Sequence, residues 1–483
     1  MTSKSPLPPL RGEMSRSDRG GVGWRPADRA AKQGSPPCLR HLPRKGGEGE
    51  LCVSPTKAER GPTVKFHWFH GMPWPHLPSD FRDRSNSVWV NVDSRYYDPI
   101  VGHRLYHEYL DQMEYAEHVG FDGLIVNEHH QNAVGLMPSP QLMAAALARR
   151  TSHAAIIMLG TSLPLYNPPT RLAEELAMLD VLSGGRLVAG LPVGTTMDAC
   201  FAYGANPATI RDRYREHHDL VMRALSDPEP FAWNGEFSKL RYVNIWPRPI
   251  QQPIPVWIPG GGSAETWDFC AEMGYSYSCL SFDGRFHAEE VLDAYWSRLA
   301  ELGVPFNPYQ GAVNQTFAVA ETDAEARERY EPHLHYNWYV GKHLDPRWAN
   351  APGYTSERTM RESGAATQAP PTPEPSFDER IASGTLIAGS PESVTEQIED
   401  LVKRLRVGHL IGVFQFGDMP TELTNRNTRL FAEHVIPRLR HLWGEYVDHW
   451  SPTPLNRPEA IGRDRTESNT HEQAETLELA GIN

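Results

Sequence analysis

Short apolar runs alternate with amphipathic helical patterns eight times along the middle of this chain. Because each strand is followed by a helix that returns the chain to the same edge, this order predicts a parallel sheet covered by helices, an α/β fold. Eight such units fit a closed (β/α)8 TIM barrel better than an open sheet. The predicted strands are 63–69, 121–126, 154–164, 186–194, 255–260, 275–282, 311–321 and 409–417.

The barrel is predicted to occupy residues 63–450. The helical pattern at 169–185 begins with Pro and is followed by Gly, which is the usual order of helix-boundary residues. A Pro-rich stretch at 364–377 interrupts the folded region before the last strand. We expect residues 344–383 to form an insertion that acts as a mobile lid. The other helices are predicted at 104–120, 140–152, 207–226, 264–274, 287–302, 391–406 and 421–439, with one more after the strand at 311–321.

Both ends of the chain differ in composition from the barrel. Residues 1–62 have almost no apolar periodicity and carry 12 Lys and Arg against 6 Asp and Glu. We expect a disordered basic extension there and a disordered polar tail at 451–483. A tail that binds nucleic acid or a membrane is the alternative interpretation of the basic extension.

Composition restricts the class of protein. The formal net charge of −13 argues against nucleic acid or an anionic membrane as the main partner. The five cysteines form no C-x-x-C pair, which is typical of a reducing compartment without a disulfide framework. No run of about 18 apolar residues and no signal peptide is visible, so we expect a cytoplasmic protein without a membrane span.

The segment "FDGLIVNEHHQN" ends an apolar strand in four polar residues, among them Asn127, His129 and His130. In a (β/α)8 barrel the active site lies at the carboxyl ends of the strands. Adjacent residues of an extended chain point to opposite faces, so the two histidines cannot bind one metal ion without a kink. An acid–base role needs only one histidine. We therefore expect no metal site here.

Other predicted strand ends supply further candidates. The first strand ends in "FHWFHGMPWPHLP", whose aromatic residues suggest a pocket wall for an apolar substrate; core packing is the alternative. Trp68, His70 and Asn127 are the candidate substrate-binding residues. Thr161 and Ser162 lie near the end of the third predicted strand, Gly194 ends the fourth, and all three are candidate cofactor-binding residues.

The stretch "PVWIPGGGSAETWDFCAEMG" predicts a strand, a glycine turn and a helix. Gly261 and Gly262 let the backbone approach a ligand closely, and the Ser263 and Thr266 hydroxyls lie at the helix start. Backbone N–H groups and the helix dipole there would favour a phosphate. A plain turn before a Ser-capped helix is the alternative. The turn is neither a P-loop nor a Rossmann glycine motif, so a nicotinamide site of that type is absent.

These pieces, in this order, resemble the bacterial luciferase-like flavin-dependent monooxygenases. The resemblance rests on "GFDGLIVNEHH", "GLMPSPQLMAAALA", "GTSLPLYNPPTRLAEELAMLDVLSGGRLVAG", "PVWIPGGGSAETWDFCAEMG" and "AGSPESVTEQIEDL", and it covers about 64–439. It implies an oxidoreductase with a (β/α)8 barrel that reacts reduced FMN with dioxygen and oxygenates a small, apolar organic substrate through a peroxyflavin. A branch of the family uses reduced deazaflavin for hydride transfer instead.

The resemblance also implies roles for particular residues. His129 would be the catalytic histidine, Thr161 and Ser162 would support the isoalloxazine ring, and the glycine turn would bind the flavin phosphate. In luciferase an arginine after the fourth strand contacts that phosphate, but Val193 stands here. Family membership further implies a separate flavin reductase and a homodimer formed through the second and third barrel helices.

Two other classes compete with this interpretation. A metal-dependent barrel hydrolase is disfavoured by the adjacent histidines. A flavin-binding or storage protein with a degenerate site is disfavoured by the presence of His129 together with the glycine turn.

Overall fold

The computed structural model describes residues 64–280, 284–341, 343–344, 346–349, 351–356 and 373–455. The predicted extension at 1–62 and the part of the predicted tail from 456 onward lie outside the described residues. The chain divides into two units, Met1–Lys57 and Ala58–Asn483, and the described residues all belong to the second.

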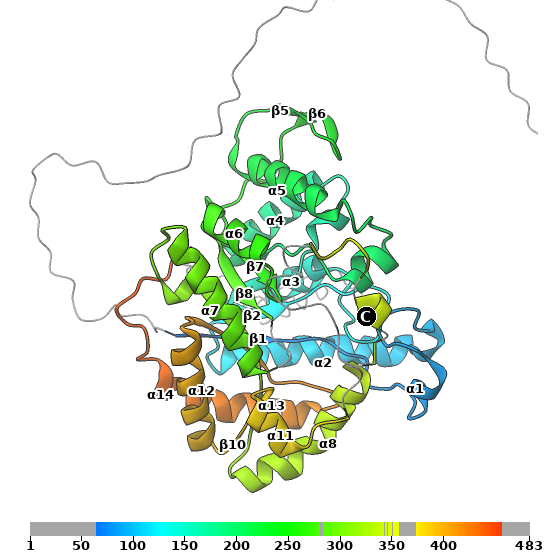
Figure 1. Ribbon diagram of the computed structural model, residues 1–483, viewed down its shortest axis with the longest axis vertical. Helices are drawn as coiled ribbons and strands as arrows, with labels where there is room; N and C mark the ends of the chain where they lie inside the picture. Colours follow the sequence, from blue (N-terminus) through cyan, green and yellow to red (C-terminus); the bar gives the residue numbers. More distant parts are fainter. Residues whose placement is uncertain are drawn as a thin grey trace, which may run out of the picture. The chain divides into compact units, whose positions relative to one another are not determined.

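Eight parallel strands close into a barrel, which confirms the predicted fold class (Figure 1). They are β1 (Lys65–Phe69), β2 (Gly123–Val126), β3 (Ala155–Leu159), β4 (Leu187–Gly190), β7 (Val256–Gly260), β8 (Ser276–Cys279), β9 (Gly311–Val319) and β11 (His409–Val413). Each pairs with the next in this order, and β11 pairs back to β1 with Lys65 opposite His409. All eight lie within or next to the predicted runs.

Helices cover the outside of the barrel and return the chain between strands (Figure 1). The long ones are α2 (Pro99–His118), α3 (Pro140–Arg150), α4 (Thr170–Ser183), α5 (Ile210–Ser226), α6 (Ala264–Met273), α7 (Arg285–Glu301), α8 (Asp323–Gly341), α12 (Pro391–Leu405) and α13 (Thr421–Leu430). Short ones are α1 (Phe81–Arg84), α9 (Pro346–Ala349), α11 (Phe377–Ser383) and α14 (Ile436–Leu439). Helix α4 ends at Gly184 in the left-handed conformation, as the Gly after the pattern predicts.

Three local features differ from the prediction. An antiparallel hairpin, β5 (Phe231–Asn234) and β6 (Lys239–Val243), follows α5, and the Glu216 carboxylate accepts three backbone N–H groups of its turn region. Strand β10 (Leu386–Gly389) pairs with the carboxyl-terminal half of β9 and adds a strand outside the eight-stranded barrel. A π-helical turn, η5 (Phe431–Val435), interrupts the last predicted helix.

Strand alternation sorts side chains between the barrel interior and the helix layer. Ile125, Ile157 and Ile411 belong to the cluster inside the barrel, whereas Leu124 and Leu410 belong to the cluster under the helices. Successive strand residues point to opposite faces, so this parity decides which residues at the strand ends can reach the mouth.

The C-terminal segment covers the amino ends of the strands. The Trp257 indole inside the barrel donates to the Trp450 carbonyl, and the Leu455 N–H donates to the Gly184 carbonyl. Residues 451–455, predicted as part of the disordered tail, therefore pack with the barrel. The predicted lid at 344–383 stays a prediction, and residues 357–372 within it lie outside the described part of the chain.

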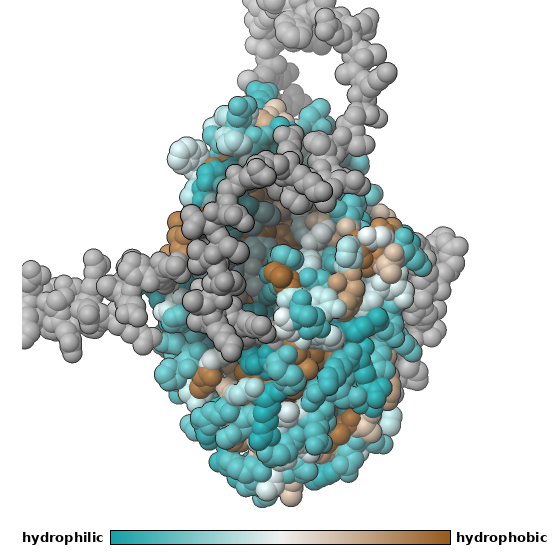
Figure 2. Space-filling view, turned by 90° about the vertical axis from the view of Figure 1, so that its left-hand side faces the viewer, coloured by the Kyte–Doolittle hydropathy of each residue, from teal (hydrophilic) through white to brown (hydrophobic). Residues whose placement is uncertain are grey.

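The face of the protein in Figure 2 is mainly hydrophilic, and its hydrophobic residues gather in small groups (Figure 2). Within the described ranges, no helix is both long enough and apolar enough to cross a bilayer.

Candidate active site

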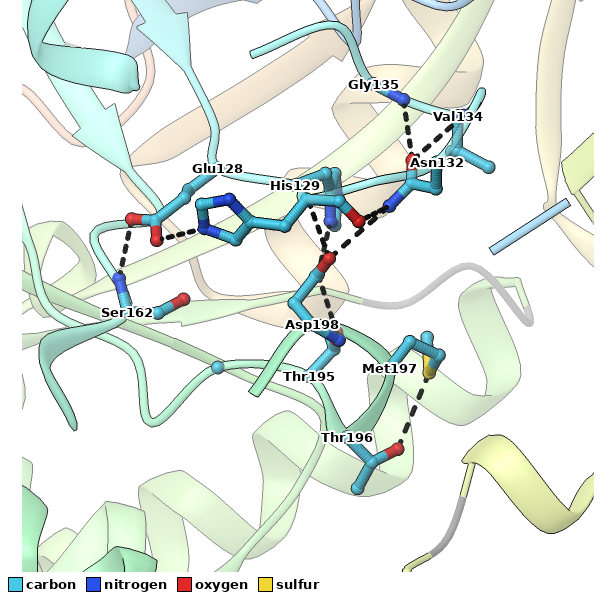
Figure 3. Close-up of polar contacts among 12 residues, drawn as sticks. Glu128, His129, Asn132, Val134, Gly135, Ser162, Thr195, Thr196, Met197 and Asp198 are labelled. Atoms are coloured by element: carbon cyan, nitrogen blue, oxygen red, sulfur yellow. Dashed lines mark hydrogen bonds and ion pairs between the residues drawn. The ribbon is translucent and has the colours of Figure 1, made fainter. Parts of the chain in front are cut away.

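His129 and Asp198 form a hydrogen-bonded pair at the carboxyl end of β2. His129 Nδ1 lies 2.8 Å from Asp198 Oδ2, which also accepts the Thr195 hydroxyl at 2.8 Å. The other carboxylate oxygen accepts the His130 N–H at 2.7 Å and the Asn132 amide at 3.3 Å (Figure 3). Asp198 thus receives four hydrogen bonds from two strand ends, which fixes its carboxylate beside His129.

The Asp198 carboxylate stays ionised although it is buried. Burial alone would raise its pKa, but the hydrogen bonds from His129, the His130 N–H and Thr195 outweigh this and lower the pKa of Asp198. An ionised carboxylate only accepts hydrogen bonds, so His129 must carry its proton on Nδ1. The lone pair of the neutral ring is then on Nε2, which has no hydrogen-bond partner among the described residues.

Asp198 comes from a local structure that the sequence patterns did not predict. It lies in the π-helical turn η3 (Met197–Ala202) that follows β4. Such turns widen the backbone by one residue and are frequent at functional sites. A signal is present in the sequence, because the hydroxyl pair Thr195–Thr196 before Asp198 is typical of a helix start.

The Glu128 side chain links the end of β2 to the end of β3. One carboxylate oxygen lies 2.7 Å from His130 Nε2, and the other accepts the Ser162 N–H at 2.9 Å and the Tyr166 hydroxyl at 3.1 Å. His130 is buried and its ring packs on Tyr203. The two histidines therefore point to different partners, and His130 supports the loop.

Among the buried oxygen atoms without a hydrogen-bond partner in the part of the chain that is described, Asn127 Oδ1 follows β2 and Thr161 Oγ1 follows β3. Each residue lies two positions after an inward-facing residue, Ile125 or Leu159. Leaving a buried polar atom unpaired costs about 1–3 kcal/mol. A bound polar ligand at the carboxyl ends of β2 and β3 would remove this cost.

Ser162, the other predicted ring-supporting residue, and Gly194, a predicted cofactor-binding residue, contact each other next to this position. A Cβ at Gly194, which has φ +102°, would come 3.1 Å from the Ser162 hydroxyl oxygen. Ser162 and Gly194 therefore pack against each other across the ends of β3 and β4. The absence of a side chain at 194 is required by this approach.

The glycine turn joins β7 to α6, as predicted. Gly262 has φ +110°, and a Cβ added at Gly261 would meet no atom within 4 Å, so the turn is open on that side. Ser263 is the N-cap residue of α6, and its hydroxyl donates to Glu265 at 2.8 Å. Thr266 lies in the first turn of α6, and its N–H donates to the Ser263 carbonyl. The turn can receive a phosphate, with the Glu265 carboxylate hydrogen-bonded to Ser263 beside it.

Trp68 and His70 lie outside the barrel mouth, which does not fit their predicted role in substrate binding. The Trp68 indole donates to Thr428 of α13, and His70 Nε2 lies 3.1 Å from the amide oxygen of Gln112 in α2. His70 Nδ1 accepts the Met72 N–H, and burial lowers the pKa of His70 to about 3. The reason is strand parity, because Trp68 and His70 face the helices.

Two aromatic residues missed by the sequence reasoning lie nearer to the mouth. Phe69, next to Trp68 but of opposite parity, packs against the cluster inside the barrel. Trp89, in the segment between β1 and α2, places its ring 5.1 Å from that of His129. Alternation from a known inward residue would have found Phe69, whereas no sequence pattern pointed to Trp89.

Among the residues that the structure describes, no three His, Cys, Asp or Glu side chains are grouped so that they could hold a metal ion. The arrangement suits proton transfer: the Nδ1 side of the His129 imidazole is held by a carboxylate, and Nε2 has no hydrogen-bond partner among the described residues.

A family model described as luciferase-like monooxygenase matches residues 92–407. The chain is 25% identical to 4-hydroxyprotoasukamycin monooxygenase of Streptomyces nodosus subsp. asukaensis, over 68% of this chain and 85% of that protein. It is 32% identical to limonene 1,2-monooxygenase of Rhodococcus erythropolis, over 52% of this chain and 65% of that protein.

Solved structures share the fold. The oxygenating constituent of 3,6-diketocamphane monooxygenase from Pseudomonas putida, in complex with FMN, aligns with a TM-score of 0.58 and 17% identity, over 78% of this chain and 99% of that one. An F420-dependent secondary alcohol dehydrogenase in complex with an F420–acetone adduct aligns with a TM-score of 0.54 and 17% identity, over 78% and 98%.

Proposed function

Because the chain belongs to the luciferase-like monooxygenase family, and is therefore an oxidoreductase, we propose that it uses reduced FMN and dioxygen to oxygenate a small, apolar organic substrate. The observation that carries this proposal is the His129–Asp198 pair beside two unpaired buried oxygen atoms at the strand ends. A base and a polar cradle for a flat ring lie at the same end of one barrel.

The residues present fit a flavin. Asn127 Oδ1 and Thr161 Oγ1 would accept or exchange hydrogen bonds with the polar edge of the isoalloxazine ring. The open backbone of Gly261, together with the N-terminus of α6, would receive the phosphate. When bound, reduced FMN supplies the electrons that activate dioxygen.

Side chains of the protein would transfer protons and limit the entry of water. His129 Nε2 would accept a proton from the substrate or donate it back, while Asp198 holds Nδ1–H and stabilises the charge that forms on the ring. Phe69 and Leu280 pack against the cluster inside the barrel and would face the apolar part of a substrate. Apolar walls would also limit the entry of water, which favours oxygenation over wasteful flavin oxidation.

Reduced deazaflavin is the second candidate cofactor, with hydride transfer in place of oxygenation. Val193 supports this alternative, because it stands where luciferase has the arginine that contacts the FMN phosphate. The same His129 Nε2 would then take the proton of an alcohol as the hydride leaves. The separate flavin reductase stays a prediction of the family resemblance.

Anaerobic titration of the purified chain should show that reduced FMN binds more tightly than oxidised FMN and reduced deazaflavin. The reason is the match between the unpaired oxygens, the glycine turn and an FMN-sized ligand. Isothermal titration calorimetry with the three ligands is the measurement. Tighter binding of reduced deazaflavin would overturn the monooxygenase proposal and support the alternative, and no binding of any of the three would overturn both.

We also propose a homodimer through α3 and α4. Leu142 on α3 is 67% exposed and Met178 on α4 is 53% exposed, although the two helices pack side by side. Val181 and Leu182 add further exposed apolar surface on α4. Apolar side chains gathered on neighbouring helices are typical of a covered interface.

The double substitution Leu142→Lys and Met178→Lys should convert the dimer to a folded monomer, because two charges would be buried in the apolar contact. Sedimentation velocity measures the change in mass. Lysine at exposed Phe306, on a remote loop, is the control and should leave the dimer intact. If the double variant stays dimeric, α3 and α4 do not form the dimer interface.

A further inference from the structure

Trp89 lies beside the proposed base, in a part of the chain that the family model does not cover. The match begins at residue 92, so the segment that carries Trp89 precedes it. The Trp89 and His129 rings are 5.1 Å apart with an interplanar angle of 79°, an edge-to-face contact. The contact therefore joins His129 to a residue outside the matched range.

The His129 ring is held on three sides. Asp198 holds Nδ1, and Trp89 packs on the ring edge-to-face. On a third side lies Gly135, where an added Cβ would stand 3.2 Å from His129 Cδ2 and 3.3 Å from its Cβ. A side chain at 135 would crowd the imidazole. Nε2 is left as the ring nitrogen that can meet a ligand.

Trp89 is itself fixed by hydrogen bonds to two other segments. Its indole N–H donates to the Gly341 carbonyl at the end of α8, at 3.0 Å. Next to it, the Val88 N–H donates to the His343 carbonyl, and the Val88 carbonyl accepts the Ala133 N–H. The segment that carries Trp89 is thus tied to the loop that follows His130 and to the end of α8, just before the predicted lid.

We propose that Trp89 is a positioning residue for His129. The indole keeps the imidazole in the rotamer that Asp198 requires and shields it from bulk water, so that Nε2 is reached only through the barrel mouth. The inference rests on the proposed role of His129 as the base, but the position and shielding of the ring do not depend on which flavin binds.

The test measures how fast each histidine reacts with diethyl pyrocarbonate, which modifies accessible, unprotonated imidazole nitrogens. Peptide mass spectrometry follows His129 and, as an internal reference, His333, which has a similar Nδ1–carboxylate contact and a similar side-chain exposure, 20% against 17%. We expect Trp89→Ala to raise the His129 rate severalfold and to leave His333 unchanged. Trp89→Phe, which keeps an aromatic ring, should restore most of the protection.

Trp443→Ala is the matched control. Its indole N–H also donates to a backbone carbonyl, that of Val407, and it also packs against the core while only partly buried, but at the opposite end of the barrel. It should leave the His129 rate unchanged. Trp89→Leu, which keeps apolar volume without a ring, replaces Trp89→Ala if the alanine variant does not fold.

The proposal is overturned if His129 reacts at the wild-type rate in a folded Trp89 variant without a ring. A parallel rise at His333 would also overturn it, because the effect would then be a general loosening. The assay needs no flavin, so failure of the proposed FMN chemistry leaves its result unaffected. Loss of reduced-FMN affinity in Trp89→Phe would assign Trp89 to the cofactor site and contradict the positioning role.

Discussion

Replacement of His129 by alanine should lower turnover by about 10²–10⁴-fold, the usual contribution of a general acid or base, while the barrel stays folded. The side chain lies at the barrel mouth and not in the hydrophobic core, and Asp198 keeps three other hydrogen-bond donors without it. The rate of product formation with reduced FMN, dioxygen and the best substrate from a panel of small apolar compounds is the measurement. Reduced-FMN affinity should not change.

His333→Ala is the matched control for this variant. His333 Nδ1 lies 2.7 Å from Asp418 Oδ1, so the alanine variant loses the same kind of histidine–carboxylate contact. His333 belongs to α8 and not to the pair that is proposed to act in catalysis. Its turnover should equal that of the wild type. If His129→Ala keeps wild-type turnover, His129 has no part in the chemistry and the proposed mechanism is wrong.

Asp198→Asn should lower turnover by between about 10² and 10⁴-fold, because it changes the tautomer of His129. The asparagine oxygen can still accept the His130 N–H, but its amide nitrogen would then face His129 Nδ1 and require an acceptor there. The proton would move to Nε2, and the ring would lose the lone pair that faces the mouth. Rate measurements over a range of pH test this.

The control for Asp198→Asn is Asp180→Asn. Asp180 is also fully buried and accepts two hydrogen bonds from Gln251, but it lies at the amino ends of the strands. We expect a similar loss of stability without a loss of turnover. Equal turnover in the two variants would contradict the role assigned to Asp198.

The lowered pKa of Asp198 also predicts a pH dependence of stability. The folded-state pKa lies below the ordinary value of about 3.9, so ionised Asp198 stabilises the fold above that pH and this contribution is lost as the pH falls through the folded-state pKa. Between about pH 5 and pH 3, the free energy of unfolding of the wild type should therefore fall more steeply than that of Asp198→Asn. Urea unfolding at several pH values measures both slopes.

Local sequence patterns were sufficient to predict the barrel, because the residues of each strand and helix favour that element by themselves. Buried runs such as Gly123–Val126 and cap signals such as Pro391 after Ser390 predict the element wherever the rest of the chain lies. Hairpin β5–β6 was missed because its strands are half exposed and carry mixed polarity. Strand β10 was missed because its four residues follow the Pro-rich stretch and pair only with the end of β9.

The barrel, the strand end that carries His129 and the glycine turn at the start of α6 could be predicted from the chain alone, because they depend on periodicity and on residues that are neighbours in the chain. The surroundings of His129 depend on how the chain folds. Asp198 is 69 positions away and approaches it through a π-helical turn, and Trp89 is 40 positions away. Trp68 and His70 face the helices and not the mouth, because the closure of the sheet decides which side chains of a strand point inward. Sequence patterns cannot predict these contacts, because the contacts form only when separate strand ends meet at one edge of the barrel.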